Sequence, residues 1–427
     1  MFSGEHQYVL ADMDLILGLQ RRVLAVELSE SVLQMRELRP QPPNLRRRNI
    51  YLPFDIVLNI LTRLPVKSLM RFRCVSKSWN SSIISSDFIS THLNNSKDAH
   101  GDGYVIHMPC VRDIYSSSIN TKRPVCTVAL DRTFDKISEV GIPFHFPFGC
   151  AQIVGSCNGL LCFATSAYRI YLWNPSIRIF KRLPNTCIGQ LRFATLGFAY
   201  DSENNDYKVV RISRSPFSAP ESSHEIEVYT LSSDSWRSVG TTLTTDVLLY
   251  DKNHPLPIPL VNGTLHWMSR IVEEEENRRR RMIMAFDVNS EKFKRLAVPV
   301  GSTDENIFQT FLSSFKGKLA FITWARSEQD GTQYSIWVMK KYGVVESWIK
   351  LSVVPFERVA HCTAFMEYGS LLVCYINDRV ESQEFKFVSV DIETLHEKKD
   401  LDIQHHSYVA TFMESLVLLD GANVVSY

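Results

Sequence analysis

The stretch SCNGLLCFATSAYRIYLWNPSIRIFKRLP (156–184) decides the fold of most of this 427-residue chain. Short runs rich in Leu, Ile, Phe, Tyr and Trp alternate in it with Asn-Gly and Asn-Pro-Ser, which are typical of tight turns. Such runs predict antiparallel strands joined by hairpins. Related segments recur downstream of residue 184, so we expect a repeating fold.

Two kinds of segment repeat with a period of about 50 residues. Members of the first kind align on Trp173, Tyr229, Phe286, Trp337 and Val390. The steps between these residues are 56, 57, 51 and 53. Members of the second kind place a turn glycine before an apolar run, at Gly159, Gly263, Gly317 and Gly369. Their steps are 104, 54 and 52, and in the double step LGFAYDSENNDYKVV (196–210) replaces the glycine turn with an Asp-rich one.

A period of this length with four strands per unit predicts an all-β propeller of kelch type. Five units are clear. Three strands are left over, at 103–108, 126–131 and 408–420. We expect these N- and C-terminal strands to form a sixth, composite blade, which would close the ring and hide its sheet edges. A two-sheet sandwich would explain neither the regular spacing nor the related hairpins.

The strand connections are expected to separate onto two faces. In an antiparallel four-stranded blade, the first and third connections share one face, and the second connection shares the other with the inter-blade link. Here the first and third connections are short, whereas second connections such as 213–224 and 272–281 are long and polar. Long loops on a rigid scaffold commonly carry binding. The candidate target-binding residues on this face are Arg214, Phe217, Glu221, Tyr250, His254, Glu274, Arg279, Arg326, Asp330, Asp378 and Arg379.

Residues 50–93 show a helical pattern instead. The first helix presents one continuous apolar face, made of Ile56, Val57, Ile60, Leu61 and Leu64. A unit of about forty residues cannot bury so wide a face by itself, and we expect the face to dock on another domain or another protein.

Start and stop signals divide this helical region. Pro53 suits a first helical turn, and the Leu64-Pro65 pair ends the helix. Short helices follow at 66–75 and 77–84, the second capped by Ser76, and a last turn capped by Ser86 is expected at 87–93.

Residues 1–48 form a separate N-terminal region. Good helix formers run from Leu10 to Leu38, and a Pro/Arg-rich linker then ends the helix. Half of its heptad seam is polar, so three interpretations stay open: a helix lying on the rest of the protein, a poorly ordered extension, or a dimerisation helix. The acidic start does not fit a secretory signal, and no run of eighteen apolar residues occurs, so we expect a cytoplasmic or nuclear protein with no membrane partner.

The composition excludes several classes of function. Lys and Arg number 47 against 46 Asp and Glu, a balance that argues against a nucleic-acid partner. The nine cysteines are odd in number and contain no CxxC pair, which favours reduced thiols over disulfides or a zinc site. No hydrolase, metalloprotease or nucleotide-binding motif is present. We therefore predict no catalytic residue, no metal and no cofactor.

Two blocks of the chain resemble known families. LPFDIVLNILTRLPVKSLMRFRCVSKSWNSSI, which begins at Leu52, closely resembles the F-box, a small all-α domain of three helices that we place at 49–93. Residues 103–427 resemble the kelch-type F-box-associated domain of plant F-box proteins, because SCNGLLC, LWNPS, LGFAYD, DYKVV, SWR and NGTLHW occur in this order. No Gly-Gly or Trp-Asp dipeptide is present, which sets the chain apart from standard kelch and WD-repeat propellers.

The resemblance implies a non-catalytic substrate-recognition subunit of an SCF E3 ubiquitin ligase. Its F-box would bind the Skp-type adaptor, and through it cullin and the RING subunit, while the propeller would hold an unknown target protein. The positions that the resemblance assigns to the adaptor are Leu52, Pro53, Ile56, Val57, Ile60, Leu61, Leu64, Pro65, Leu69, Phe72, Val75 and Trp79. Among them Leu69, Phe72 and Val75 fit the F-box core as well as an interface. The alternative is a ligand-sensing or carbohydrate-binding propeller, or a propeller enzyme, with no ligase role.

Overall fold

The computed structural model describes the helical region and most of the strand repeats. The described residues are 53–99, 103–109, 125–130, 134–143, 151–165, 169–186, 193–214, 224–240, 243, 247–249, 256–273, 278–302, 307–326, 331–356, 361–367, 369–377, 384–398, 401, 403, 407–418 and 424–426. The N-terminal region 1–48, with its expected helix, lies outside them. No helix in these ranges has the length and apolar character needed to cross a bilayer.

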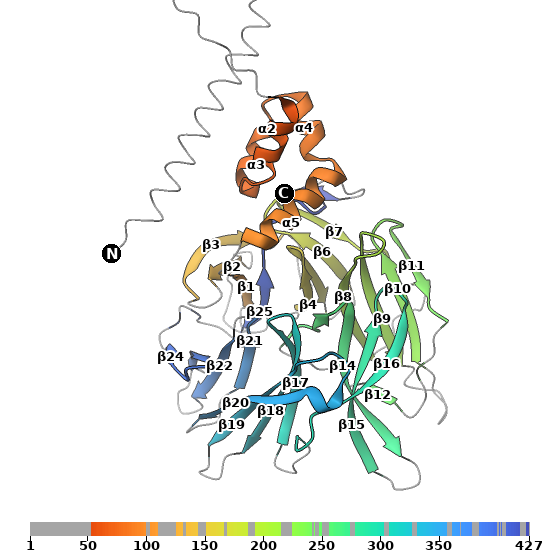
Figure 1. Ribbon diagram of the computed structural model, residues 1–427, viewed down its shortest axis with the longest axis vertical. Coiled ribbons are helices and arrows are strands. Elements are labelled where there is room, and N and C mark those ends of the chain that lie inside the picture. The colour runs from red at the N-terminus through yellow and green to blue at the C-terminus, as the bar shows by residue number, and fades with distance from the viewer. Residues whose placement is uncertain are drawn as a thin grey trace, which may run out of the picture. The chain divides into compact units, whose positions relative to one another are not determined.

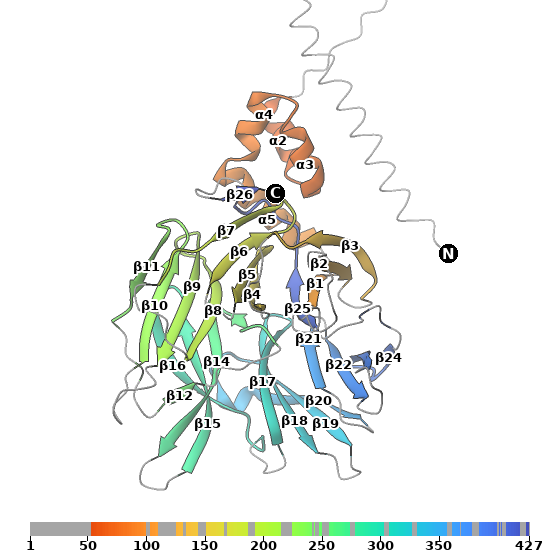
Figure 2. The same cartoon turned by 180° about the vertical axis from the view of Figure 1, so that it is seen from behind.

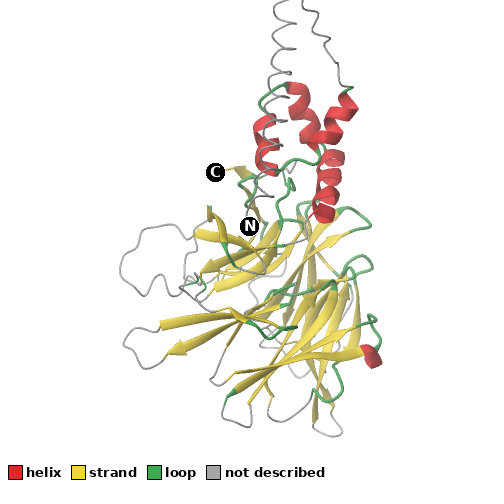
Figure 3. Cartoon of the chain, turned by 60° about the vertical axis from the view of Figure 1, so that its left-hand side comes forward, coloured by secondary structure: helices red, strands yellow, loops and turns green. Residues whose placement is uncertain are grey.

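The F-box region folds into a chain of short helices, drawn in red in Figure 3. The last of them is a full helix of 14 residues, where the sequence predicted only a single turn at 87–93. The helices are α2 (Phe54–Leu61), α3 (Val66–Phe72), α4 (Lys77–Ile83) and α5 (Ser86–Ala99).

Of the two N-terminal helix caps predicted from the sequence, one is confirmed and the other lies one residue earlier. Ser76 caps α4 as expected, because its hydroxyl accepts a hydrogen bond from the Trp79 N–H at 3.1 Å. The predicted cap at Ser86 is wrong by one residue. Ser85 accepts the hydrogen bond from the Phe88 N–H, at 3.3 Å, and Ser86 is the first helical residue.

The repeats form six antiparallel sheets around a common centre (Figure 1), so the predicted six-bladed propeller is confirmed. We number the blades I to VI. Blade I contains β25 (Ser407–Phe412), β1 (Tyr104–Pro109), β2 (Val125–Leu130) and β3 (Lys136–Gly141). Blade II contains β4 (Ala151–Cys157), β5 (Leu160–Thr165), β6 (Ile170–Asn174) and β7 (Ile179–Arg182). Blade III contains β8 (Phe193–Asp201), β9 (Asp206–Arg214), β10 (His224–Thr230) and β11 (Ser235–Ser238).

The remaining three blades follow the same plan. Blade IV contains β12 (Val247–Leu249), β13 (Leu260–Val261), β14 (Thr264–Glu273), β15 (Arg278–Asp287) and β16 (Lys292–Ala297). Blade V contains β17 (Ile307–Phe315), β18 (Lys318–Arg326), β19 (Thr332–Met339) and β20 (Trp348–Phe356), with the short helix η1 (Val345–Ser347) before β20. Blade VI contains β21 (His361–Phe365), β22 (Ser370–Asn377), β23 (Glu384–Asp391) and β24 (Glu397–Lys398).

Equivalent residues of the repeat occupy equivalent places in the blades. Trp173, Tyr229, Phe286 and Val390 each lie on the third strand of a blade and are at most 1% exposed. The first turns repeat as well. In the turn between β4 and β5, Asn158 and Gly159 have φ angles of 54° and 76°, the left-handed pair that a tight hairpin requires. The period read from the sequence is therefore the period of the blades.

The ends of the propeller domain are joined by strand pairing, as expected. β25 pairs antiparallel with β1, in a register that runs from Tyr104 opposite Phe412 to Pro109 opposite Ser407. A second pairing was not expected. The short strand β26 (Val425–Ser426) adds to the outer edge of β7, where Figure 2 shows the two strands side by side. The C-terminal part of the chain thus contributes to blades I and II.

A buried asparagine holds the segment that runs between these two strands. Asn174, in the LWNPS motif, is fully buried, and its side-chain N–H groups donate to the carbonyl oxygens of Val417 at 2.8 Å and Ser415 at 3.0 Å. Gly159 leaves room for the same segment, because a Cβ there would lie 2.4 Å from the carbonyl oxygen of Met413. The repeat motifs SCNG and LWNPS thus also hold the ring closed.

One expected loop proved to be mostly strand. The sequence predicted a long polar connection at 272–281, but β14 continues to Glu273 and β15 begins at Arg278, with these two residues paired. Strand pairing gives partners to backbone groups that a loop would leave to water, and this outweighs the high charge of the segment. The connection between β9 and β10 is also shorter than the predicted 213–224, since β9 reaches Arg214.

Candidate functional site

The first F-box helix exposes large apolar side chains. Phe54 is 45% exposed and Ile56 is 43% exposed, while Val57 and Ile60 are half-buried. Exposed apolar residues grouped on one short helix indicate a surface that another molecule covers. Phe54 was not among the predicted contact residues, although its place directly after Pro53 could have drawn attention to it.

Other predicted adaptor residues form the interior of the F-box. Leu61, Leu69 and Phe72 are 2%, 0% and 3% exposed. Trp79 is half-buried, and its ring meets the Phe72 ring edge-on, with the centroids 5.5 Å apart. In the free chain these side chains pack the helices together, so of the two roles left open for Leu69 and Phe72 the structure favours the core. Val75 is half-buried.

The break between α2 and α3 exposes the residues that the sequence singled out there. Pro65 is exposed and Leu64 is half-buried, and Pro53, which directly precedes α2, is exposed as well. Leu52 lies outside the described residues. Helix α2 and the break that follows it thus both present exposed apolar side chains. Their contact with an adaptor stays a prediction.

The predicted target-binding residues are only partly described. Arg326 is the exposed last residue of β18. For Arg214 and Arg279 the structure describes the backbone, at the end of β9 and within β15. The other predicted residues of that face lie outside the described residues: Phe217, Glu221, Tyr250, His254, Glu274, Asp330, Asp378 and Arg379.

An aromatic cluster lies on the same face, at the ends of the strands of blades V and VI. The ring of Trp324 on β18 lies 5.6 Å from the Phe308 ring on β17 and 5.4 Å from the His361 ring on β21, centroid to centroid. Phe308 is 60% exposed, while Trp324 and His361 are half-buried. The aromatic cluster continues inward through Tyr334, Phe356 and Tyr375.

A β-bulge directs Phe308 outward. The pairing of β17 with β18 places Ile307 opposite Ala325 and Gln309 opposite Trp324, so Phe308 is the extra residue. Bulges of this kind re-aim side chains and are common near functional sites. The indole N–H of Trp324 is buried and has no hydrogen-bond partner among the described residues. The aromatic cluster was not predicted, because its residues lie inside strands, whereas the predicted binding residues lie in the long polar connections.

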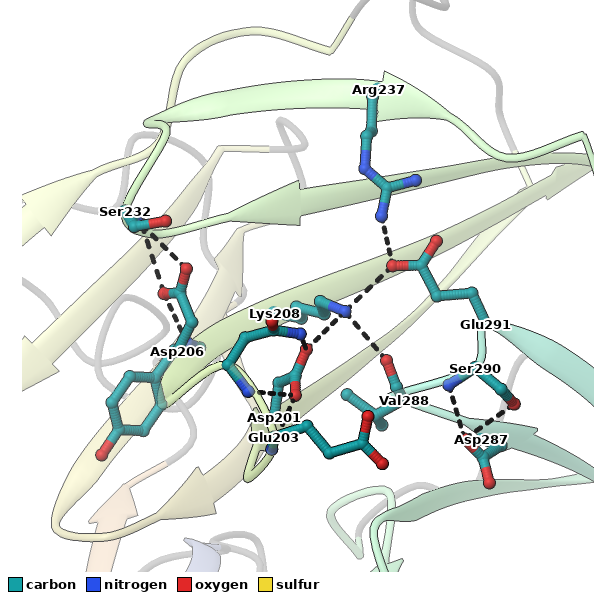
Figure 4. Close-up of polar contacts among 12 residues, drawn as sticks. Asp201, Glu203, Asp206, Lys208, Ser232, Arg237, Asp287, Val288, Ser290 and Glu291 are labelled. Atoms are coloured by element: carbon teal, nitrogen blue, oxygen red, sulfur yellow. Dashed lines mark hydrogen bonds and ion pairs between the residues drawn. The ribbon is translucent and has the colours of Figure 1, made fainter.

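A network of charged side chains surrounds the buried Lys208, as Figure 4 shows. The Lys208 ammonium is buried and lies 2.6 Å from an Asp201 carboxylate oxygen and 3.0 Å from Glu291. It also donates to the carbonyl oxygen of Val288 at 2.9 Å, and Arg237 forms a second ion pair with Glu291. The network thus joins blade III to the turn between β15 and β16 of blade IV.

The electrostatics of this network indicate a structural role. All three N–H donors of the ammonium have acceptors, so none is left for a ligand. Burial alone would raise the pKa of Asp201 and lower that of Lys208, but their mutual hydrogen bond and charges shift both pKa values the other way. Both groups therefore stay ionised near neutral pH, as expected of a structural ion pair. No group of His, Cys, Asp or Glu suited to a metal ion occurs within the described ranges.

Comparison with known proteins identifies both parts of the chain. The model of the F-box domain matches residues 51–91, and the model of the F-box associated beta propeller domain matches residues 105–419. The F-box/kelch-repeat protein At3g23880 of Arabidopsis thaliana is 29% identical over 326 residues, which cover 71% of this chain and 79% of the relative. F-box protein CPR1 of the same plant is 26% identical over 364 residues, covering 80% and 82%.

Solved structures add nothing to this assignment. The match to apo AztD from Citrobacter koseri covers 73% of this chain and 98% of the AztD chain, at 9% identity and a TM-score of 0.33. The family models account for the exposed helical unit and for the six-bladed ring that the geometry displays. The chain belongs to the family of F-box proteins that carry an F-box-associated β-propeller domain.

Proposed function

We propose that this protein is the substrate-recognition subunit of an SCF E3 ubiquitin ligase. The observation that carries the proposal is the pair of exposed apolar residues on α2, Phe54 and Ile56, in an F-box that shares its chain with a closed propeller. The F-box binds the Skp-type adaptor, which connects it to cullin and the RING subunit. The assembly acts in the cytoplasm or the nucleus.

In this role the protein positions the target protein and catalyses no reaction itself. By holding a target on the propeller and the adaptor on the F-box, it raises the concentration of the target near the catalytic subunits, as any pair of linked binding modules does. The Lys208 network supports a non-catalytic role for this part of the propeller, since every N–H donor of its buried ammonium already has an acceptor within the fold.

The target protein binds on the face that carries the second connections, and the aromatic cluster is its anchor. Interface energy concentrates in a few aromatic residues at well-packed sites, and Phe308 and Trp324 offer such residues beside an exposed Arg326.

Reconstitution tests the ligase role. The purified chain is mixed with the Skp-type adaptor, cullin and the RING subunit, and assembly is followed by size-exclusion chromatography. We expect one four-component complex with the native chain and none with Ile56→Asp, because a carboxylate would be buried in the apolar contact. Ile56 is already 43% exposed in the free chain, so this variant does not disturb the core. Native chain that stays apart from the other components would refute the proposal.

The target face is tested by comparing two exposed residues. Plant-extract proteins retained by the native chain are quantified against those retained by Phe308→Ala and by Val344→Ala, whose side chain is 42% exposed in the turn between β19 and β20. We expect Phe308→Ala to lose specific proteins that Val344→Ala still retains. Equal retention by both variants would exclude the aromatic cluster as the anchor.

A further inference from the structure

The backbone break between α2 and α3 is held by side chains of a later helix. α2 ends at Leu61, and the next residues lead to Pro65, which has no N–H to donate. The N–H groups of Ser68 and Leu69 both bond to the carbonyl oxygen of Pro65. Because carbonyls at the end of a helix lack partners in their own helix, those of Thr62 and Leu64 need donors from elsewhere.

Helix α5 supplies both donors. The Nε2 atom of His92 lies 2.9 Å from the carbonyl oxygen of Leu64, and the Asn95 side-chain amide donates to the carbonyl oxygen of Thr62 at 3.3 Å. The same amide donates to the Thr62 hydroxyl at 3.1 Å, and that hydroxyl donates to the carbonyl oxygen of Asn59 at 2.9 Å. Two side chains one helical turn apart thus bond to both ends of the break.

The surroundings of His92 favour a neutral ring whose Nε2 atom is the hydrogen-bond donor. The side chain is 2% exposed, and its Nδ1 atom is buried with no hydrogen-bond partner among the described residues. A proton on Nδ1 would therefore be unsatisfied, so the ring is neutral with its hydrogen on Nε2, facing Leu64. Burial lowers the pKa of His92, which agrees with this assignment.

We infer that His92 and Asn95 are positioning residues for the Skp-type adaptor: they hold the break so that Leu64 and Pro65 face the partner. We call these two side chains the α5 clamp. The inference rests on the proposed function and deepens it. Leu64 and Pro65 present one fixed surface to a partner only if their backbone is held in place. The backbone hydrogen bonds within the break are short-range i→i+3 bonds, such as that from the Leu64 N–H to the Leu61 carbonyl oxygen. An adaptor would otherwise have to order the break as it binds, and this ordering lowers affinity.

The test compares adaptor affinity among full-length variants. His92→Leu introduces an apolar side chain of similar volume and removes the donor, whereas His92→Gln keeps an N–H donor near the Nε2 position. Asn95→Ala removes the other donor at a half-buried site. The matched control is Thr91→Ala, since Thr91 is exposed on the same helix and its hydroxyl donates to the Asp87 carbonyl oxygen within α5.

We expect His92→Leu, which loses one hydrogen bond of a fully buried side chain, to weaken adaptor binding about tenfold. Asn95→Ala, which loses two hydrogen bonds of a half-buried side chain, should weaken it by about threefold. His92→Gln should recover most of the affinity, and Thr91→Ala should match the native chain. Hydrogen exchange of the free chain should speed up at residues 62–69 in His92→Leu, with α4 unchanged. This local pattern separates positioning from general loss of F-box stability, which would loosen all four helices together.

Three results would overturn the inference: native affinity in both His92→Leu and Asn95→Ala, equal loss in His92→Leu and His92→Gln, or faster exchange throughout the F-box. A native chain that binds no adaptor would refute the proposed function instead. In that case the exchange pattern at 62–69, which needs no adaptor, still decides whether the α5 clamp holds the break.

Discussion

Replacing Asn174 by alanine should open the closure of the propeller. The Asn174 amide donates to the carbonyl oxygens of Ser415 and Val417, and all three residues are buried. An alanine has no donor, so two buried carbonyls would lose their partners at roughly 1–3 kcal/mol each. We therefore expect the free energy of unfolding to fall by about 2–6 kcal/mol, a large part of the roughly 5–15 kcal/mol that is usual for a folded domain.

Urea denaturation followed by tryptophan fluorescence measures this loss. Gln152→Ala, an exposed amide on β4 of the same blade, is the matched control and should leave the urea midpoint unchanged. Hydrogen exchange should also rise first in β25 and β1, because the closing segment leads directly from β25. A native midpoint and native exchange in Asn174→Ala would refute the reasoning, and would mean that the strand pairing alone closes the ring.

Two further predictions concern the packing between blades and a buried histidine. Gly197→Ala should lower the free energy of unfolding by about 1–3 kcal/mol, because its Cβ would lie 2.6 Å from the Trp267 ring, while Gly240→Ala, with open space around it, should be neutral in the same thermal melt. The pKa of His266, lowered to about 4 by burial, predicts pH-dependent stability. In the unfolded chain His266 takes up a proton near pH 6.5, whereas in the folded chain it stays neutral down to about pH 4. The free energy of unfolding should therefore fall by about 2 kcal/mol between pH 7 and pH 5. Urea denaturation at both pH values checks this, and an equal pH effect in His266→Gln would contradict it.

Much of the fold could be predicted because the sequence repeats with the period of the blades. The third-strand residues Trp173, Tyr229 and Phe286 are buried in each blade for the same packing reason, so their period reports the blade directly. The composite blade followed from counting strands and from the need to cover sheet edges. β26 could not be found this way, since a two-residue pairing leaves no periodic pattern.

The functional surfaces were harder to predict, for physical reasons that differ between them. Ile56 stands in a helical pattern that also includes the buried Leu61, and only the packed structure separates surface from core. The outward direction of Phe308 depends on a bulge, which shifts the side-chain alternation by one residue without a sequence signal. The α5 clamp joins residues 28 and 33 positions apart, a distance over which helical periodicity carries no information.

Direct titration of the purified Skp-type adaptor into the full-length chain tests the central claim most directly. The native chain is compared with the double variant Leu64→Asp, Pro65→Ala, and with Leu395→Asp, which alters an exposed residue in a propeller turn. We predict a tight complex for the native chain and for Leu395→Asp, and an affinity about a hundredfold weaker for the double variant, with the melting of the propeller unchanged. A folded native chain that does not bind the adaptor, or a double variant that binds as tightly as the native chain, would contradict the account.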